Sequence, residues 1–210
     1  MAIGTTQRHA SIIHGYGASP GDHWFGWLRE QLSADGIPAT IPALPNPQNP
    51  DPAQWMETVR ADLGTPDENQ IVVAHSLGCL TVLRYLRTLQ GPWHLGTLVL
   101  VSGFVDQLPA LPELDSYIGD GCDVAGLREH LGRLTVFRSD ADPYVPPHHT
   151  DRLAGLLGTC SVVVPGAGHF LASDGVTSLH EALEAAGVAL RKRPADAASG
   201  RDRRHPPYAN

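Results

Sequence analysis

Short runs of apolar residues alternate along the chain with longer stretches in which apolar residues recur every three to four positions. The short runs predict β-strands at residues 11–13, 71–75, 97–101, 134–137 and 161–164. The longer stretches predict helices at residues 24–32, 54–63, 77–89, 150–157 and 177–190. One more strand is predicted over residues 39–44, at a sheet edge because Pro42 cannot donate to a central ladder. This alternation predicts βαβ units and a parallel sheet.

The periodic pattern stops before the end of the chain. Residues 194–210 are polar and aperiodic, and such a segment cannot bury enough apolar surface to offset its ordering entropy. We therefore expect a folded domain over residues 1–193 and a disordered tail over 194–210. A chain of 210 residues is long enough for one domain with a sizeable core.

Composition narrows the classes of function. The formal net charge is −7, from 15 Lys and Arg against 22 Asp and Glu, which argues against a nucleic-acid partner. Three cysteines leave one unpaired in any disulfide scheme, so reduced thiols are the simpler expectation. Residues 1–8 lack the apolar core of a signal peptide, and no apolar stretch approaches the ~18 residues of a membrane span. We expect a cytoplasmic protein that does not enter a membrane.

The segment Ala74-His75-Ser76-Leu77-Gly78 carries the clearest chemical signal. A β-branched run precedes it and a helical pattern follows, so Ser76 stands on a strand-to-helix turn between two small residues. This arrangement is typical of the nucleophile elbow of α/β-hydrolases, in which larger flanking side chains would collide with neighbouring backbone. Ser76 is the predicted nucleophile, whereas His75 is expected to pack or to form a hydrogen bond.

The partners of such a serine follow it in the order acid, then histidine. The predicted strand 134–137 leads into a loop with Asp140 and Asp142, and the strand 161–164 leads into a Gly-rich loop with His169. Both loops lie at carboxyl ends of strands, where open parallel sheets place their sites. Asp142 is the predicted acid because Pro143 biases it toward an extended conformation, whereas Asp140 is expected to cap the turn through its own backbone.

Two main-chain N–H groups are predicted to form an oxyanion hole. The first belongs to Leu77, the residue after the serine. The second comes from the loop His14-Gly15-Tyr16-Gly17 after the first core strand, with Tyr16 as the first choice and Gly17 as the second.

The chain resembles the small serine hydrolases of the retinoblastoma-binding protein nine and YdeN type, within the α/β-hydrolase superfamily. The resemblance spans roughly residues 10 to 190, and besides the loops above it is carried by residues 21–27, 44–47, 100–103 and 168–170. It implies the triad Ser76, Asp142 and His169 in a six-stranded, mainly parallel sheet of order 2-1-3-4-5-6 with helices on both faces. The connection 104–133 is the usual place for a lid, and its length predicts little or no lid. The mammalian member of this family is associated with a partner-binding motif, L-x-C-x-E. Residues 77–81 begin in the same way but have Thr81 in place of the glutamate, so no such partner is expected.

These features predict a carboxylesterase-like serine hydrolase that cleaves a small ester or related acyl substrate through an acyl-enzyme. No cofactor is expected. No metal is expected either, since the adjacent His148 and His149 have no further ligands at suitable spacing. Two alternatives stay open: an acyltransferase with the same triad, and a protein-binding module on a hydrolase scaffold. The sequence carries no signal for an oligomeric state.

Overall fold

A computed structural model describes residues 7–188, so the predicted tail 194–210 lies outside the described residues. The sheet has six strands in the order β2-β1-β3-β4-β5-β6, and all five pairings are parallel. This confirms the predicted order. The strands are β1 (His9–Ile13), β2 (Ala39–Thr40), β3 (Gln70–His75), β4 (Leu95–Val101), β5 (Leu131–Arg138) and β6 (Ser161–Val163).

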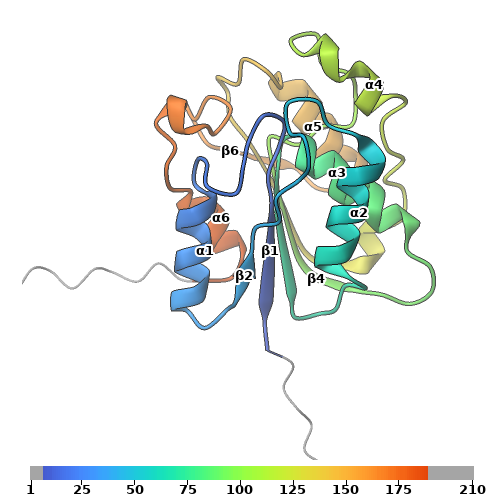
Figure 1. The fold of residues 1–210 in the computed structure, drawn as a ribbon, viewed down its shortest axis with the longest axis vertical. Coiled ribbons are helices and arrows are strands. Elements are labelled where there is room, and N and C mark those ends of the chain that lie inside the picture. The colour runs from blue at the N-terminus through green and yellow to red at the C-terminus, as the bar shows by residue number, and fades with distance from the viewer. Residues whose placement is uncertain (1–6, 189–210) are drawn as a thin grey trace, which may run out of the picture.

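Helices cover both faces of the sheet (Figure 1). One face carries α1 (Phe25–Ala34) and α6 (His180–Ala185), and the other carries α2 (Pro52–Leu63), α3 (Leu77–Thr88) and α5 (Pro147–Leu156). The central strand β3 is buried along its whole length: Val72 and Ala74 pack into one core, and Ile71 and Val73 into the other. A strand buried on both faces reads as a continuous apolar run, which is why the sequence pattern identified it.

Local signals explain where the helices depart from their predicted bounds. The helix predicted from residue 54 begins at Pro52, because the Asp51 side chain accepts a hydrogen bond from Gln54 N–H at the helix start. The helix predicted over 150–157 is α5, which begins earlier, at Pro147. The helix predicted over 177–190 is shorter in the structure, where only α6, His180–Ala185, is helical within that range. Gly187 stops it in a left-handed conformation, where Gly187 N–H donates to Glu184 O and Val188 N–H to Leu183 O.

The edge strand is also shorter than predicted. Only Ala39 and Thr40 pair with β1, whereas the pattern extended to residue 44. Pro42 breaks the ladder, and farther on Leu44 N–H donates to His14 Nε2 instead of to a strand.

The connection from β4 to β5 contains two short 3-10 turns and the single helical turn α4 (Asp115–Ile118). Figure 1 shows α4 above the carboxyl ends of the strands. The Arg84 guanidinium of α3 donates to the carbonyls of Tyr117, Ile118 and Gly121, and Tyr117 Oη bonds Thr81 Oγ1. These hydrogen bonds tie the segment to α3.

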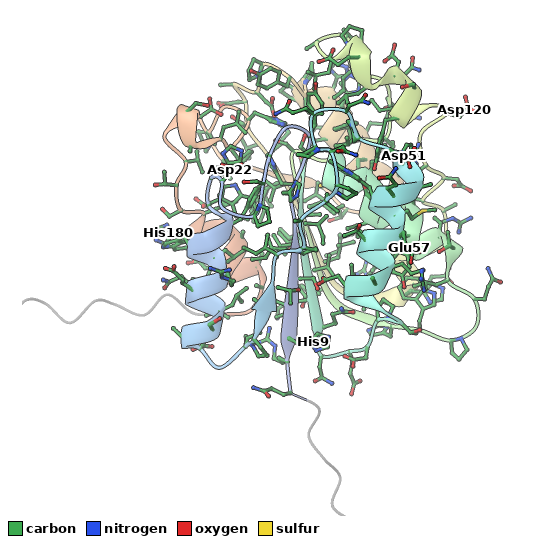
Figure 2. All side chains as sticks on the ribbon, in the orientation of Figure 1. His9, Asp22, Asp51, Glu57, Asp120 and His180 are labelled. Atoms are coloured by element: carbon green, nitrogen blue, oxygen red, sulfur yellow. The ribbon has the colours of Figure 1, made fainter. Side chains whose placement is uncertain are left out.

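The polar surface surrounds these two cores. Figure 2 shows the labelled His180 and Glu57 on the outer sides of the two helical layers, with His9 at the end of the sheet opposite the loops. Within residues 7–188, no helix combines the length and the apolar character that a membrane crossing requires.

Candidate active site

Ser76 occupies a sharp turn between β3 and α3. Its φ is 53° and ψ is −124°, a conformation that L-residues rarely adopt, and Ser76 N–H donates to Val101 O at 2.9 Å. Small neighbours make the turn possible: a Cβ at Gly78 would lie 2.4 Å from His14 O, and one at Gly15 would lie 2.9 Å from Ser76 Cβ. The turn therefore presents the Ser76 hydroxyl against the loop after β1, as the elbow motif predicts.

The structure brings the three predicted site side chains together. His169 Nε2 lies 3.0 Å from Ser76 Oγ, and His169 Nδ1 lies 2.8 Å from Asp142 Oδ2. All three side chains are buried, and they come from the ends of β3, β5 and β6. A serine, an imidazole and a carboxylate joined in this order have the geometry of a nucleophile, its base and the group that orients the base.

Asp142 is held by four hydrogen bonds. Its Oδ1 accepts from the N–H groups of Tyr144 and Val145, each at 2.9 Å, and its Oδ2 accepts from Ser102 Oγ at 2.8 Å besides the bond with His169. Burial alone would raise the pKa of Asp142. The hydrogen bond and charge of His169, aided by Val145 N–H and Ser102, outweigh burial and hold that pKa below its usual value. The carboxyl group is therefore ionised at neutral pH.

Asp140 has a different role from the one expected. Its Oδ1 accepts from Gly166 N–H at 2.7 Å and so joins the loop after β5 to the loop after β6. The expected cap of its own turn is wrong, because Ser139 Oγ fills that place by accepting from Ala141 N–H at 3.0 Å. Asp140 lies outside the contacts of the His169 imidazole, which bonds Asp142.

The predicted main-chain donors lie on both sides of Ser76. Leu77 is the first residue of α3, so its N–H has no acceptor inside the helix. Gly17 N–H donates to Pro47 O at 2.8 Å, which removes the second choice for the other donor. Among residues 7–188, no acceptor pairs with Tyr16 N–H. Tyr16 and Leu77 thus stay the predicted oxyanion donors.

A cavity of about 290 Å³ opens over Ser76 and His169. Its described lining combines apolar side chains with polar groups and includes no Lys, Arg, Asp or Glu: Tyr16, Gly17, Gln48, His75, Ser76, Leu111, Tyr144, His169 and Leu171. Trp24 and Trp55, by contrast, are completely buried core residues. Such a cavity suits an uncharged ligand of small size.

Sequence reasoning did not identify Ser102 or Asp174 as site residues. Ser102 directly follows β4, has a φ of 47°, and donates to Asp142 across 40 residues of sequence. Asp174 Oδ2 accepts from His169 N–H at 2.8 Å and from Leu171 N–H at 3.1 Å. A polar residue directly after a buried apolar strand was a usable signal for Ser102, because such strand ends meet at the site. Asp174 follows no strand and had no comparable signal.

His75 is buried beside the site and hydrogen-bonded, as expected. Its Nε2 lies 2.9 Å from His169 O, and its ring packs against Trp24 and Phe25. Burial lowers the pKa of His75 well below its usual value, and the nearby His169 and His23 act in the same direction. His75 is therefore neutral at neutral pH.

The neutral His75 makes the stability of the fold depend on pH. The unfolded chain binds a proton below a pH of about 6.5, whereas the folded chain excludes it until its own, lower pKa is reached. Stability from this source is present above pH 6.5. It falls on acidification by up to about 1.4 kcal/mol per pH unit.

Urea unfolding at pH 7.5, 6.5 and 5.5 measures this dependence. His75→Gln is expected to flatten the fall in unfolding free energy below pH 6.5. His94→Gln, at an exposed histidine, is expected to keep the wild-type slope. Equal slopes in the wild type and in His75→Gln would contradict a buried neutral His75.

No cluster of three or more His, Cys, Asp or Glu side chains suited to a metal ion occurs within residues 7–188. Cys79, Cys122 and Cys160 are free. Cys79 lies in the elbow helix, fully buried, and burial raises the pKa of its thiol far above the usual value. A protonated, enclosed thiol is a poor nucleophile, so the Ser76 hydroxyl stays the predicted nucleophile of this site.

Comparisons with known proteins find a family model and relatives that match most of this chain. The model of the serine hydrolase family matches residues 10–186. A protein named as a hydrolase, YdeN of Bacillus subtilis (strain 168), is 41% identical over 172 residues, which cover 82% of this chain and 90% of YdeN. The serine hydrolase RBBP9 of Rattus norvegicus is 26% identical over 149 residues, covering 70% of this chain and 77% of RBBP9.

A solved structure is also similar to this chain. The crystal structure of the ydeN gene product from B. subtilis superposes with a TM-score of 0.81 at 39% identity. The match covers 85% of this chain and 96% of that chain.

Proposed function

The chain belongs to the serine hydrolase family, with the α/β-hydrolase fold, and from this we propose that it hydrolyses small uncharged esters through an acyl-enzyme on Ser76. The observation that carries the proposal is the pair of hydrogen bonds, 3.0 Å and 2.8 Å long, that join Ser76 Oγ through His169 to Asp142. The same triad leaves open whether an acyl acceptor other than water is used.

The first half of the reaction forms the acyl-enzyme. Ser76 Oγ attacks the ester carbonyl while His169 Nε2 takes the hydroxyl proton. The N–H groups of Leu77 and Tyr16 stabilise the oxyanion, and each such donor contributes about 3 kcal/mol to transition-state stability. The protonated His169 then gives its proton to the leaving alcohol, and the acyl group stays on Ser76.

The second half releases the acid. A water molecule gives a proton to His169 and attacks the acyl carbon, and the collapse of the intermediate returns the proton to Ser76 Oγ. Asp142, ionised and held by four hydrogen bonds, keeps Nδ1 of His169 protonated and stabilises the imidazolium.

Esters of graded size and charge test the substrate class. The cavity of about 290 Å³ stands at the small end of ligand sites, so kcat/KM for p-nitrophenyl esters is expected to rise over short acyl groups and to gain nothing from long ones. The butyrate and the hemisuccinate provide a pair of similar length that differs in charge. The hemisuccinate is expected to react at least about tenfold more slowly, because its carboxylate must enter a described lining that offers no Lys or Arg to pair with it.

The contradicting results are distinct. Preference for the hemisuccinate would overturn the uncharged substrate class but keep the hydrolase. Failure of the folded protein to hydrolyse any of these esters would overturn the proposed ester hydrolysis itself.

A further inference from the structure

Every polar group of His169 has one protein partner. Two hold the imidazole, as described: Asp142 at Nδ1 and Ser76 at Nε2. The other two hold the main chain: Asp174 Oδ2 accepts from His169 N–H at 2.8 Å, and His75 Nε2 lies 2.9 Å from His169 O. We call His75 and Asp174 the main-chain clamp. The clamp fixes the two peptide units that flank the His169 Cα.

The His75 side of the clamp comes from the nucleophile elbow. A carbonyl oxygen only accepts, so His75 Nε2 carries the hydrogen and donates it to His169 O. His75 Nδ1 is then unprotonated, and among the described residues it is buried without a partner. The surrounding rings of Trp24 and Phe25 would pack equally against a phenyl group. The hydrogen bond from Nε2 to His169 O therefore explains why a histidine stands at position 75, although its Nδ1 has no partner among the described residues.

The Asp174 side of the clamp shapes the loop that carries His169. Asp174 Oδ2 accepts from both His169 N–H and Leu171 N–H, so both bonds converge on a single oxygen atom. The loop closes tightly around this carboxylate: a Cβ at Gly168, whose φ is 54°, would lie 2.5 Å from Asp174 Cγ. Ala172 N–H donates to His23 Nδ1 at 3.0 Å and ties the same loop to the segment before α1.

We propose that His75 and Asp174 are positioning residues of the reaction, which hold the His169 main chain so that the imidazole stays in line between Ser76 and Asp142. The inference rests on the proposed function. His75 directly precedes Ser76, so one short segment fixes the nucleophile through its turn and the base through this hydrogen bond. A misplacement of the base by about 1 Å can cost on the order of 100-fold in rate, which is why the main-chain contacts matter.

Paired variants test each side of the clamp by kcat and KM on one p-nitrophenyl ester. His75→Phe keeps an aromatic ring but loses the donor, and Asp174→Ala loses the acceptor. Each is expected to lower kcat about 10- to 100-fold with KM changed less than about threefold. His75→Gln keeps an N–H donor and Asp174→Asn keeps one acceptor oxygen, so both are expected to recover most of the loss. Ser173→Ala, at an exposed residue beside Asp174, is the control and is expected to match the wild type.

The His169→Ala background separates positioning from a merely structural role. His169→Ala keeps the main-chain groups that the clamp holds but removes the imidazole. If the clamp acts through the imidazole, His75→Phe and Asp174→Ala leave the residual rate of His169→Ala unchanged. An equal fold-loss in both backgrounds would overturn the proposal, as would unchanged kcat in both single variants.

The wild type distinguishes this failure from failure of the proposed function. A wild type that hydrolyses esters, with an inactive Ser76→Ala and unaffected clamp variants, overturns the clamp alone. A folded wild type that neither hydrolyses esters nor reacts with a fluorophosphonate overturns the proposed function and the clamp with it. If His75→Phe does not fold, the Asp174→Ala and Asp174→Asn pair decides by the same criteria.

Discussion

Replacing Ser76 with alanine is expected to lower kcat for ester hydrolysis on the order of 10⁶-fold, because no other group can take the acyl chain. Cys79, the adjacent thiol, is buried and protonated. The fold should survive, since the substitution removes one hydrogen bond, the one between Oγ and His169 Nε2. Steady-state kinetics and the melting temperature measure both effects.

Two further variants serve as controls for this prediction. Ser11→Ala removes an equally buried hydroxyl on β1 and is expected to keep wild-type turnover. Adding His169→Ala to Ser76→Ala is expected to cost little more, because the members of a triad act as one unit. A Ser76→Ala protein with more than a small fraction of wild-type turnover would contradict the assignment of the nucleophile.

Replacing Asp142 with asparagine is expected to lower kcat on the order of 10⁴-fold, because the amide favours the wrong tautomer of the histidine. Asp142 Oδ2 receives the His169 Nδ1 hydrogen at 2.8 Å, and an amide NH2 in its place would require that nitrogen to accept instead. The effect should appear in kcat measured with one ester, on protein shown to be folded.

Asp140→Asn is the matched control. Asp140 lies two residues earlier in the same loop and accepts a single hydrogen bond, from Gly166 N–H, which an amide oxygen can also accept. Asp140→Asn is expected to lower kcat roughly tenfold or less, because it can shift the two loops that Asp140 joins. The reverse ranking of the two variants would move the acid to Asp140.

The fold was predictable because its signals are local and repeat along the chain. The two-sided burial of β3 makes residues 71–74 a continuous apolar run, and the small residues around Ser76 mark the elbow. Together with the resemblance of the site loops to a known family, these signals were sufficient to predict the strand order. The helix predicted over 177–190 runs past the end of α6 because the hydrophobic pattern does not register Gly187, the glycine that stops the helix.

The candidate site was predictable only in part. Ser76, Asp142 and His169 each follow a recognisable strand, so their meeting at one sheet edge follows from topology. The contacts around them depend on the register of loops far apart in sequence. Ser102 reaches Asp142 over 40 residues, and His75 reaches the main chain of His169 over 94. The partner of Asp140 was mistaken for the same reason, since Gly166 belongs to another loop.

The proposed reaction requires that Ser76 is the group that becomes acylated. The most direct measurement is intact-mass analysis of the folded protein after reaction with a fluorophosphonate, followed by peptide mapping. The serine Oγ displaces fluoride from phosphorus, so we expect one adduct per chain, on the peptide that contains Ser76, and none in Ser76→Ala. An adduct on another residue, or an unmodified Ser76 in protein that hydrolyses esters, would contradict it.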